Sequence, residues 1–325
     1  MEPFVVAVTD RFHLGPRRTI AVSAMVGSAN RLWRFDVAQD SFVVKELSHE
    51  RTDQIDRRRR AAFERSVFEA ASLAMPEPIV DRDGDIVTVV QGSRGEPCIV
   101  RVHRWMEGLR TPAVTSSIAA TAGAALAVIH DHGASWSTER AGSLRWWDQD
   151  PRAVIDRLHE SPLRDIASAA TALASEAIAL VAEAENTVGP WIYSHNDHKP
   201  QNALVVDGAV AVLDWDECGH CHPRLEAVES ALRWAAESAD MPGAFRAFLA
   251  AYAAAGTPIV DLSERDFGKW VAALLGWFSF QARRVLGDWA SDAAFERRQA
   301  EAMARDAVAE LERTLGSIST WASWA

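Results

Sequence analysis

The chain has 325 residues, of which 48% are hydrophobic and 24% are charged, a composition typical of a folded protein rather than a disordered one. This length allows one large domain or two smaller ones. The formal net charge of −11 argues against a general nucleic-acid binder, because binding to a phosphate backbone requires a basic surface.

No segment predicts export or a membrane partner. The first residues, MEPFVVAVTDRF, lack the basic region and long apolar core of a signal peptide. The longest uncharged stretch, Thr111 to Ile129, is mostly Ala, Thr and Ser, which favours a buried helix. Three cysteines, an odd number, argue against a disulfide framework. We therefore expect a cytoplasmic protein.

The first hundred residues predict strands interrupted by one helix. Short runs rich in Val, Ile, Phe and Trp predict strands at 19–26, 31–37, 41–47, 85–90 and 97–102. The helix is expected to begin at Thr52 or Asp53, either of which can cap it, and to end near Ala74. It carries four consecutive arginines, Arg57 to Arg60. Because these point in four directions on a helix, a solvated face is favoured over a specific anion site.

After the segment Trp105 to Gly108 the chain becomes mainly helical. Periodic apolar residues predict helices at 114–130, 163–185, 226–238, 263–286 and 291–315. Gly133 and Gly316 are expected to stop two of them. The predicted fold class is therefore α+β, with a β-rich N-terminal lobe at 1–103 and a mainly helical lobe at 104–325.

The stretch Ser194 to Asp216 predicts a hairpin that gathers oxygen ligands. Asp207 and Gly208 form a strong hairpin turn signal between two apolar runs, 203–206 and 209–213. If they are the two turn residues, Asn202 lies opposite Leu213, with Asp214 one step further, and Asp197 arrives from the preceding loop. Carboxylate and amide oxygens are ligands that Mg²⁺ accepts together with substrate phosphates.

The order of these parts resembles the aminoglycoside phosphotransferase and choline kinase family of the protein-kinase-like fold. The parts are a glycine-containing turn, Lys45 on a strand, a helix with a glutamate, the hinge WMEG, the loop HNDHKPQN and the motif VLDWDECG. The tract ALAVIHDHG is similar to a helix of that family that ends in Leu-His. The resemblance covers roughly residues 19–285 and implies a bilobal kinase fold.

The resemblance implies a role for each of these residues. Asp197 accepts the proton of the substrate hydroxyl, while Asn202 and Asp214 hold Mg²⁺. Lys45 contacts the nucleotide phosphates, and Glu64 is preferred to Glu69 as its ion-pair partner.

Two residues of the loop HNDHKPQN take further roles. His195 braces the loop through hydrogen bonds and packing. Lys199 matches the protein-kinase loop better than the phosphotransferase one, and a cation there would neutralise charge in the transition state, although a solvent-exposed lysine is the alternative.

Further nucleotide contacts are expected from the turn and from the hinge. The turn offers Gly27, Ser28 and Asn30 but only one glycine, so it cannot wrap phosphates as a protein-kinase loop does. At the hinge the candidates are His103 and Trp105.

The sequence CGHCH at 218–222 satisfies a haem-attachment pattern and offers four zinc ligands, Cys218, His220, Cys221 and His222. Four ligands within five residues close a tetrahedron only with strain, and no export signal accompanies the motif. We favour ordinary thiols in a loop beside the site.

The acceptor is indicated only by charge. Seven carboxylates against two arginines between Asp214 and Asp240 fit an amine-bearing acceptor and equally a solvated acidic face. Candidate acceptor contacts are Asp216, Glu217, Glu226 and Trp277. Asp216 can instead assist the metal or make a structural hydrogen bond, and Trp277 belongs to a helical row more typical of a core.

The predicted function is transfer of the γ-phosphoryl group of ATP, or GTP, to a hydroxyl of a small molecule, with Mg²⁺ as cofactor. The resemblance favours an aminoglycoside-like antibiotic or an amino sugar, and hence antibiotic resistance. The alternatives are a kinase of choline, a sugar or another primary metabolite, and an inactive nucleotide-binding pseudokinase. A protein kinase is disfavoured because no Ala-Pro-Glu segment follows Asp214.

Overall fold

The computed structural model describes residues 2–15, 20–25, 31–47, 54–110, 113–136, 150–161, 163–187, 189–256, 258–288 and 294–324. Packing divides the chain into two compact units. The first comprises Met1–Val114, Ala125–Trp136 and Ser194–Gly219, and the second comprises the remainder. The lobe boundary expected between residues 103 and 104 is a different division and stays a prediction.

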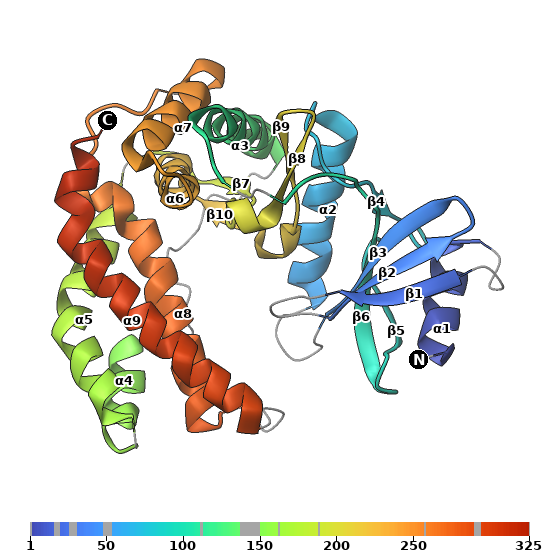
Figure 1. The fold of residues 1–325 in the computed structure, drawn as a ribbon, viewed down its shortest axis with the longest axis horizontal. Coiled ribbons are helices and arrows are strands. Elements are labelled where there is room, and N and C mark those ends of the chain that lie inside the picture. Colours follow the sequence, from blue (N-terminus) through green and yellow to red (C-terminus); the bar gives the residue numbers. More distant parts are fainter. Residues whose placement is uncertain are drawn as a thin grey trace. The chain divides into compact units, whose positions relative to one another are not determined.

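The first unit contains an antiparallel sheet with the order β1-β2-β3-β6-β4, in which β5 also pairs with β6 (Figure 1). Its strands are β1 (Ile20–Met25), β2 (Arg31–Val37), β3 (Asp40–Leu47), β4 (Pro78–Ile79), β5 (Thr88–Gln91) and β6 (Pro97–Arg104). The expected α+β class is confirmed. The short β4 and the first helix, α1 (Glu2–Phe12), were not expected from the sequence.

Alternation along β3 and β6 gives the sheet two different faces. One face packs against α1 through Phe42 and Val44 of β3 and Val100 of β6. On the other face Leu47 and Ile99 pack with Ala61 of α2 (Gln54–Ala70). Because side chains alternate, Lys45 of β3 and Arg101 and His103 of β6 also belong to the α2 face.

The predicted hairpin is present as β8 (Ala203–Val206) and β9 (Ala209–Val212). Val206 pairs with Ala209 as expected, and both turn residues, Asp207 and Gly208, have the positive φ that a two-residue type I′ turn requires. The Leu213 N–H donates to the Asn202 carbonyl over 2.8 Å, so the predicted register is confirmed.

The strand does not continue to Asp216. Asp214 has φ 59° and ψ 71°, in the left-handed region, and Trp215–Glu217 form a short 3-10 helix, η3. Asp214 and Asp216 therefore do not follow the alternation of a continuing strand, because the chain turns at Asp214.

The hinge lies directly against the hairpin. Leu109 and Val205 exchange two main-chain hydrogen bonds of 3.0 and 2.8 Å. Gly108 makes this approach possible, since a Cβ there would lie 2.9 Å from the Cβ of Leu204 and 3.0 Å from a methyl of Val206. The hinge and the hairpin thus form one packed surface.

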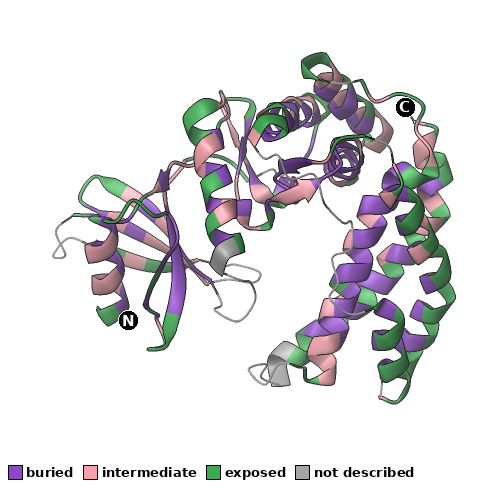
Figure 2. Ribbon diagram, turned by 180° about the vertical axis from the view of Figure 1, so that it is seen from behind, coloured by how far each residue is buried: buried purple, intermediate pink, exposed green. Residues whose placement is uncertain are grey.

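The second unit is helical. Its helices are α4 (Pro151–His159), α5 (Arg164–Glu185), α6 (Pro223–Ala236), α7 (Met241–Ala255), α8 (Gly268–Leu286) and α9 (Ala294–Ala322), and α3 (Ser116–Trp136) contributes its first turns. Most of them carry buried residues on one side and exposed residues on the other (Figure 2), whereas residues 225–232 of α6 are all buried. A strand β7 (Ile192–Ser194) pairs with β10 (Gly219–Cys221). Helices α3 and α9 run through Gly133 and Gly316, so the expected stops at these glycines are wrong.

One helix in the described ranges, α5, is long and apolar enough to cross a membrane. Ile166, Ala170 and Ala174 of this helix are buried in a cluster with residues of α4, α8 and α9. A core helix of a water-soluble protein has the same composition.

Candidate functional site

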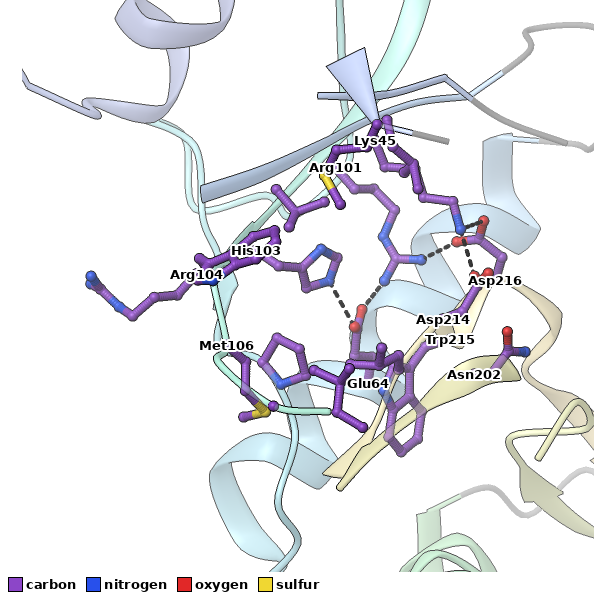
Figure 3. A pocket seen from close by; sticks show the side chains of 18 of the residues that line it. Lys45, Glu64, Arg101, His103, Arg104, Met106, Asn202, Asp214, Trp215 and Asp216 are labelled. Atoms are coloured by element: carbon purple, nitrogen blue, oxygen red, sulfur yellow. Dashed lines mark hydrogen bonds and ion pairs between the residues drawn. The ribbon is translucent and has the colours of Figure 1, made fainter. Parts of the chain in front are cut away.

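A cavity of about 270 Å³ lies within the first unit, between the α2 face of the sheet, the hinge and the hairpin (Figure 3). One part of its wall is apolar and includes Leu32, Val43, Met106, Leu204 and Leu213. The other part carries Lys45, Glu64, Arg101, Asn202, Asp214 and Asp216. The cavity therefore offers one apolar region and one charged region to the same ligand.

Lys45 reaches the two carboxylates that follow β9. Its Nζ lies 2.5 Å from an oxygen of Asp214 and 2.5 Å from an oxygen of Asp216. Burial alone would lower the pKa of Lys45, but the two carboxylates outweigh it and raise that pKa. For Asp216, burial would raise the pKa, and the charges of Lys45 and Arg101 lower it well below its usual range. Both groups are held in their charged forms.

Glu64 has other partners than the one expected. It forms an ion pair with Arg101, and its Oε1 lies 2.8 Å from Nε2 of His103. Glu69, the rival candidate, is an exposed residue that pairs with Arg65. The expected Lys45–Glu64 ion pair is thus not the one that the structure holds, because Arg101 stands beside Lys45 and takes the Glu64 carboxylate.

The arginine run on α2 is only partly solvated. Arg58 is 67% exposed, whereas Arg57 is buried and Arg60 donates to the main-chain oxygen of Asp216. Arg57, Arg60 and Glu64 are three and four residues apart and share one face of the helix. Burial lowers the pKa of Arg57. The expectation of a solvated face is therefore wrong for half of the run.

The loop before β8 places Asp197 beside Asn202. Asn202 Nδ2 donates to Asp197 Oδ2 over 2.7 Å and to the Asp197 carbonyl over 3.0 Å. Lys199 Nζ lies 2.8 Å from the same carboxylate oxygen. Because Nδ2 is engaged with Asp197, the Asn202 side chain keeps its amide oxygen as the atom suited to a metal ion.

His195 is fully buried and connects this loop to the end of β9. Its Nδ1 accepts from the Asp197 N–H over 3.2 Å, so the other nitrogen, Nε2, carries the proton and donates to the Leu213 carbonyl over 2.9 Å. Its ring also contacts Trp215, with centroids 4.9 Å apart. These contacts support the bracing role implied by the resemblance.

The two hinge candidates differ in their environment. Burial, together with Arg101 and Lys45, lowers the pKa of His103 to about 3, so the ring is neutral at physiological pH. Trp105 donates through Nε1 to Glu107 over 2.6 Å and stacks under the Arg34 guanidinium, 4.2 Å from its ring centre. Both line the cavity.

The remaining candidates lie elsewhere. Gly27, Ser28 and Asn30 fall outside the described residues. Glu217 is exposed, 3.7 Å from Arg60, and Trp277 is 46% exposed on α8. Glu226 is buried and accepts from the Cys221 thiol over 2.8 Å.

The two histidines of the CGHCH segment pack against aromatic residues near β7. Cys98, Cys218 and Cys221 are free thiols. The His220 ring packs against Tyr193 and the His222 ring against Trp191. Both histidine rings are therefore packed against aromatic side chains.

Sequence reasoning missed Arg101. The available signal was its position two residues before His103 within the apolar run of β6, which puts both side chains on one strand face. Recognising its neighbour required the register in which Lys45 lies opposite Arg101.

The donor set fits a hard cation. Asp214 supplies a carboxylate and Asn202 an amide oxygen, both at the cavity wall, and Mg²⁺ prefers a few such oxygens completed by water and phosphate. We assign Asn202 and Asp214 to this cation, and both offer oxygen ligands.

Comparison with known proteins identifies one family. A sequence model of the phosphotransferase enzyme family matches residues 25–267. No curated protein sequence matches the chain significantly.

Solved structures resemble nearly the whole chain. A microcompartment-associated aminopropanol kinase is 16% identical with a TM-score of 0.63, covering 97% of both chains. A spectinomycin phosphotransferase in complex with ADP and spectinomycin is 12% identical with a TM-score of 0.64, covering 90% of this chain and 92% of that one. An amicoumacin kinase in complex with AMP-PNP and Ca²⁺ is 11% identical with a TM-score of 0.65, covering 93% and 91%. The expected kinase-like α+β fold is confirmed.

Proposed function

Because the chain belongs to the phosphotransferase enzyme family, we propose that it is a Mg²⁺-dependent kinase that transfers the γ-phosphoryl group of ATP to a hydroxyl of a small molecule. GTP is the alternative donor. We propose that the enzyme is cytoplasmic.

One observation carries the proposal: Lys45, Asn202 and Asp214, which come from three separate segments, line the same cavity. The apolar region beside the hinge suits a nucleobase, and the charged region suits phosphates and a metal ion. Asp197 is fixed next to the charged region by its hydrogen bond to Asn202.

The reaction joins the acceptor oxygen to the γ-phosphorus and breaks the bond from that phosphorus to the bridging oxygen, which leaves with ADP. Asp197 orients the acceptor hydroxyl and takes its proton. Lys199, beside Asp197, offsets the negative charge that develops during transfer. Asn202 and Asp214 would hold Mg²⁺, which would supply positive charge to neutralise the phosphates.

We propose an amine-bearing acceptor, with an aminoglycoside-like antibiotic or an amino sugar first. The spectinomycin and amicoumacin kinases among the structural neighbours support an antibiotic, and the enzyme would then confer resistance. An amino alcohol is the second candidate, supported by the aminopropanol kinase, which matches 97% of the chain. Glu217 and Trp277 remain candidate acceptor contacts. Glu226 and Asp216 are weaker candidates, because Glu226 is buried and both oxygens of Asp216 are engaged with Lys45 and Arg101.

The test is a screen of aminoglycosides, other antibiotics, amino sugars, choline and amino alcohols with Mg·ATP and Mg·GTP, followed by mass spectrometry of each product. We expect one class to gain a phosphoryl group. Asp197→Asn, which keeps the size of the side chain, should lower the turnover by about 10²- to 10⁴-fold while nucleotide binding remains. Nucleotide binding with no product from any acceptor would favour a pseudokinase instead.

A further inference from the structure

Five charged side chains of the cavity form one alternating series, Glu64, Arg101, Asp216, Lys45 and Asp214 (Figure 3). We propose that Arg101 is a positioning residue that connects helix α2 to Lys45 through Asp216, in place of a direct Lys45–Glu64 ion pair. This inference rests on the proposed nucleotide site.

The first observation is the register of the sheet. Lys45 of β3 lies directly opposite Arg101 of β6, and the two residues are 9% and 4% exposed. Two like charges opposite each other in a buried part of a sheet repel and are destabilising. Asp216 offsets this repulsion, with Oδ2 2.5 Å from Lys45 and Oδ1 2.6 Å from Arg101. Each of its oxygens therefore serves one of the two cations.

The second observation is that β6 engages both oxygens of Glu64. Arg101 pairs with Oε2, and Nε2 of the neutral His103 lies 2.8 Å from Oε1. Glu64 is 1% exposed, so water does not compete for it. The link from α2 to Lys45 thus passes through Arg101 and Asp216.

The geometry of the guanidinium matters here. Its two terminal nitrogens address different carboxylates, Nη2 that of Glu64 and Nη1 that of Asp216. A planar fork can bridge two carboxylates in this way, whereas a lysine ammonium is a single point charge on a flexible stem. Arg101→Lys is therefore not a conservative change at this position.

The consequence concerns how Lys45 meets the nucleotide. Once Asp214 binds Mg²⁺, Asp216 is the carboxylate that remains on Lys45. Arg101 shares the charge of Asp216 and so leaves part of the charge of Lys45 for the phosphates. Without Arg101, Asp216 pairs fully with Lys45 and competes with the nucleotide for it.

A double-mutant cycle between Arg101→Met and Lys45→Met tests this, with the dissociation constant of Mg·AMP-PNP measured by calorimetry on the full-length protein. We expect each single variant to bind Mg·AMP-PNP about tenfold more weakly than wild type, and the double variant to bind it no more weakly than Lys45→Met. A departure from additivity of this size, about tenfold, is of the order measured between residues in contact. Arg58→Met is the matched control, because Arg58 is an exposed arginine of α2. This variant should bind Mg·AMP-PNP as wild type does.

A merely structural role would give a different pattern. Arg101→Met would then lower the urea midpoint of unfolding and leave the dissociation constant unchanged, or the two losses of affinity would simply multiply; either result overturns the inference. If Arg101→Met does not fold, the double variant Arg101→Met/Glu64→Gln replaces it in the cycle, because it also removes the buried Glu64 carboxylate that has lost Arg101. The last corner of the cycle is then the triple variant that also carries Lys45→Met.

Failure of the inference and failure of the proposed function look different. If wild type binds Mg·AMP-PNP and Lys45→Met weakens it while Arg101→Met does not, only the role of Arg101 is wrong. If wild type binds neither Mg·AMP-PNP nor Mg·GMP-PNP, the proposed function is wrong, and this inference fails with it.

Discussion

At the scale of single residues, Asp214, the proposed metal ligand, is where the chain turns away from the direction of β9. Its left-handed backbone is one that aspartate adopts more readily than most residues other than glycine. Asn196, in the other polar loop of this unit, also has a positive φ, 62°. Such conformations gather at functional sites, where the surrounding packing compensates for their strain. The hydrogen bond from His195 to the Leu213 carbonyl fixes the residue just before Asp214.

His103 makes stability depend on pH. Its pKa is about 3 in the folded protein, against 6.5 for an ordinary histidine. Between these values the unfolded chain binds a proton that the folded protein does not, so the free energy of unfolding falls as the pH falls below 6.5. A single group contributes at most about 1.4 kcal/mol per pH unit in this window.

The measurement is urea unfolding of wild type and His103→Gln at pH 7.5, 6.5 and 5.5. Gln stays neutral and can still donate to Glu64, so the variant should lose less stability than wild type between pH 6.5 and 5.5. Parallel loss in the two proteins would show that His103 does not titrate as the structure requires.

At the scale of elements, the contact between the hinge and the hairpin has no spare room. Gly108→Ala places a methyl group 2.9 Å from Leu204, and overpacking of this kind costs about 1–3 kcal/mol. We expect a lower thermal midpoint and weaker nucleotide binding, because the hinge borders the apolar region of the cavity. Thermal unfolding and calorimetry measure the two effects.

Gly316→Ala is the matched control for that change. Gly316 lies exposed within α9, and a Cβ there meets no atom within 4 Å. The substitution should raise stability by up to about 1 kcal/mol, since glycine is a weak helix former. Destabilisation by both substitutions to the same extent would contradict the close contact at Gly108.

The second unit contains a buried ion pair between two helices. Lys269 of α8 and Glu229 of α6 are 1% and 3% exposed and pair with each other, and Arg233 also reaches Glu229. Burial would lower the pKa of Lys269, but the carboxylates of Glu229 and Glu226 outweigh it and raise that pKa. Within the acidic segment after Asp214, the Glu229 carboxylate therefore forms an ion pair in the interior and is not part of a solvated face.

Removing one partner of this pair should be costly. Lys269→Met leaves the Glu229 carboxylate buried and undercompensated, at a cost of about 3–5 kcal/mol. The double variant Lys269→Met/Glu229→Gln should recover much of this loss, and chemical denaturation of both variants measures it. Equal stability of the single variant and wild type would contradict the burial of the pair.

The elements that could be predicted are those specified by local chemistry. The hairpin 203–212 follows from the Asp-Gly turn and the alternation around it, and its register is correct. The ends of α3 and α9 were missed because tertiary packing overrides a single glycine. In α9, Leu311 and Ile318 are buried on either side of Gly316 and hold the helix together.

At the scale of the whole molecule, the motifs predicted the family and the fold, while the pairing of charges could not be predicted. Lys45 and Arg101 are 56 positions apart and become neighbours only through the register of β3 and β6. Arg101 and Asp216 are 115 positions apart. A sequence pattern fixes which face a residue takes on a strand, but not which strand lies next to it. The partner of Glu64 was therefore beyond sequence reasoning.

The central claim is that one cavity binds a metal ion and a nucleotide together. The most direct test is to measure the dissociation constant of AMP-PNP for wild type and for Asp214→Asn, once with Mg²⁺ and once with EDTA. We predict that Mg²⁺ tightens binding to wild type about tenfold or more, equivalent to at least about 1.4 kcal/mol. We predict that Asp214→Asn loses this gain while its affinity in EDTA is retained or raised, because the Asp214 carboxylate no longer competes with the phosphates for Lys45. Equal affinity of wild type with and without Mg²⁺, or an unchanged gain in Asp214→Asn, would contradict the account.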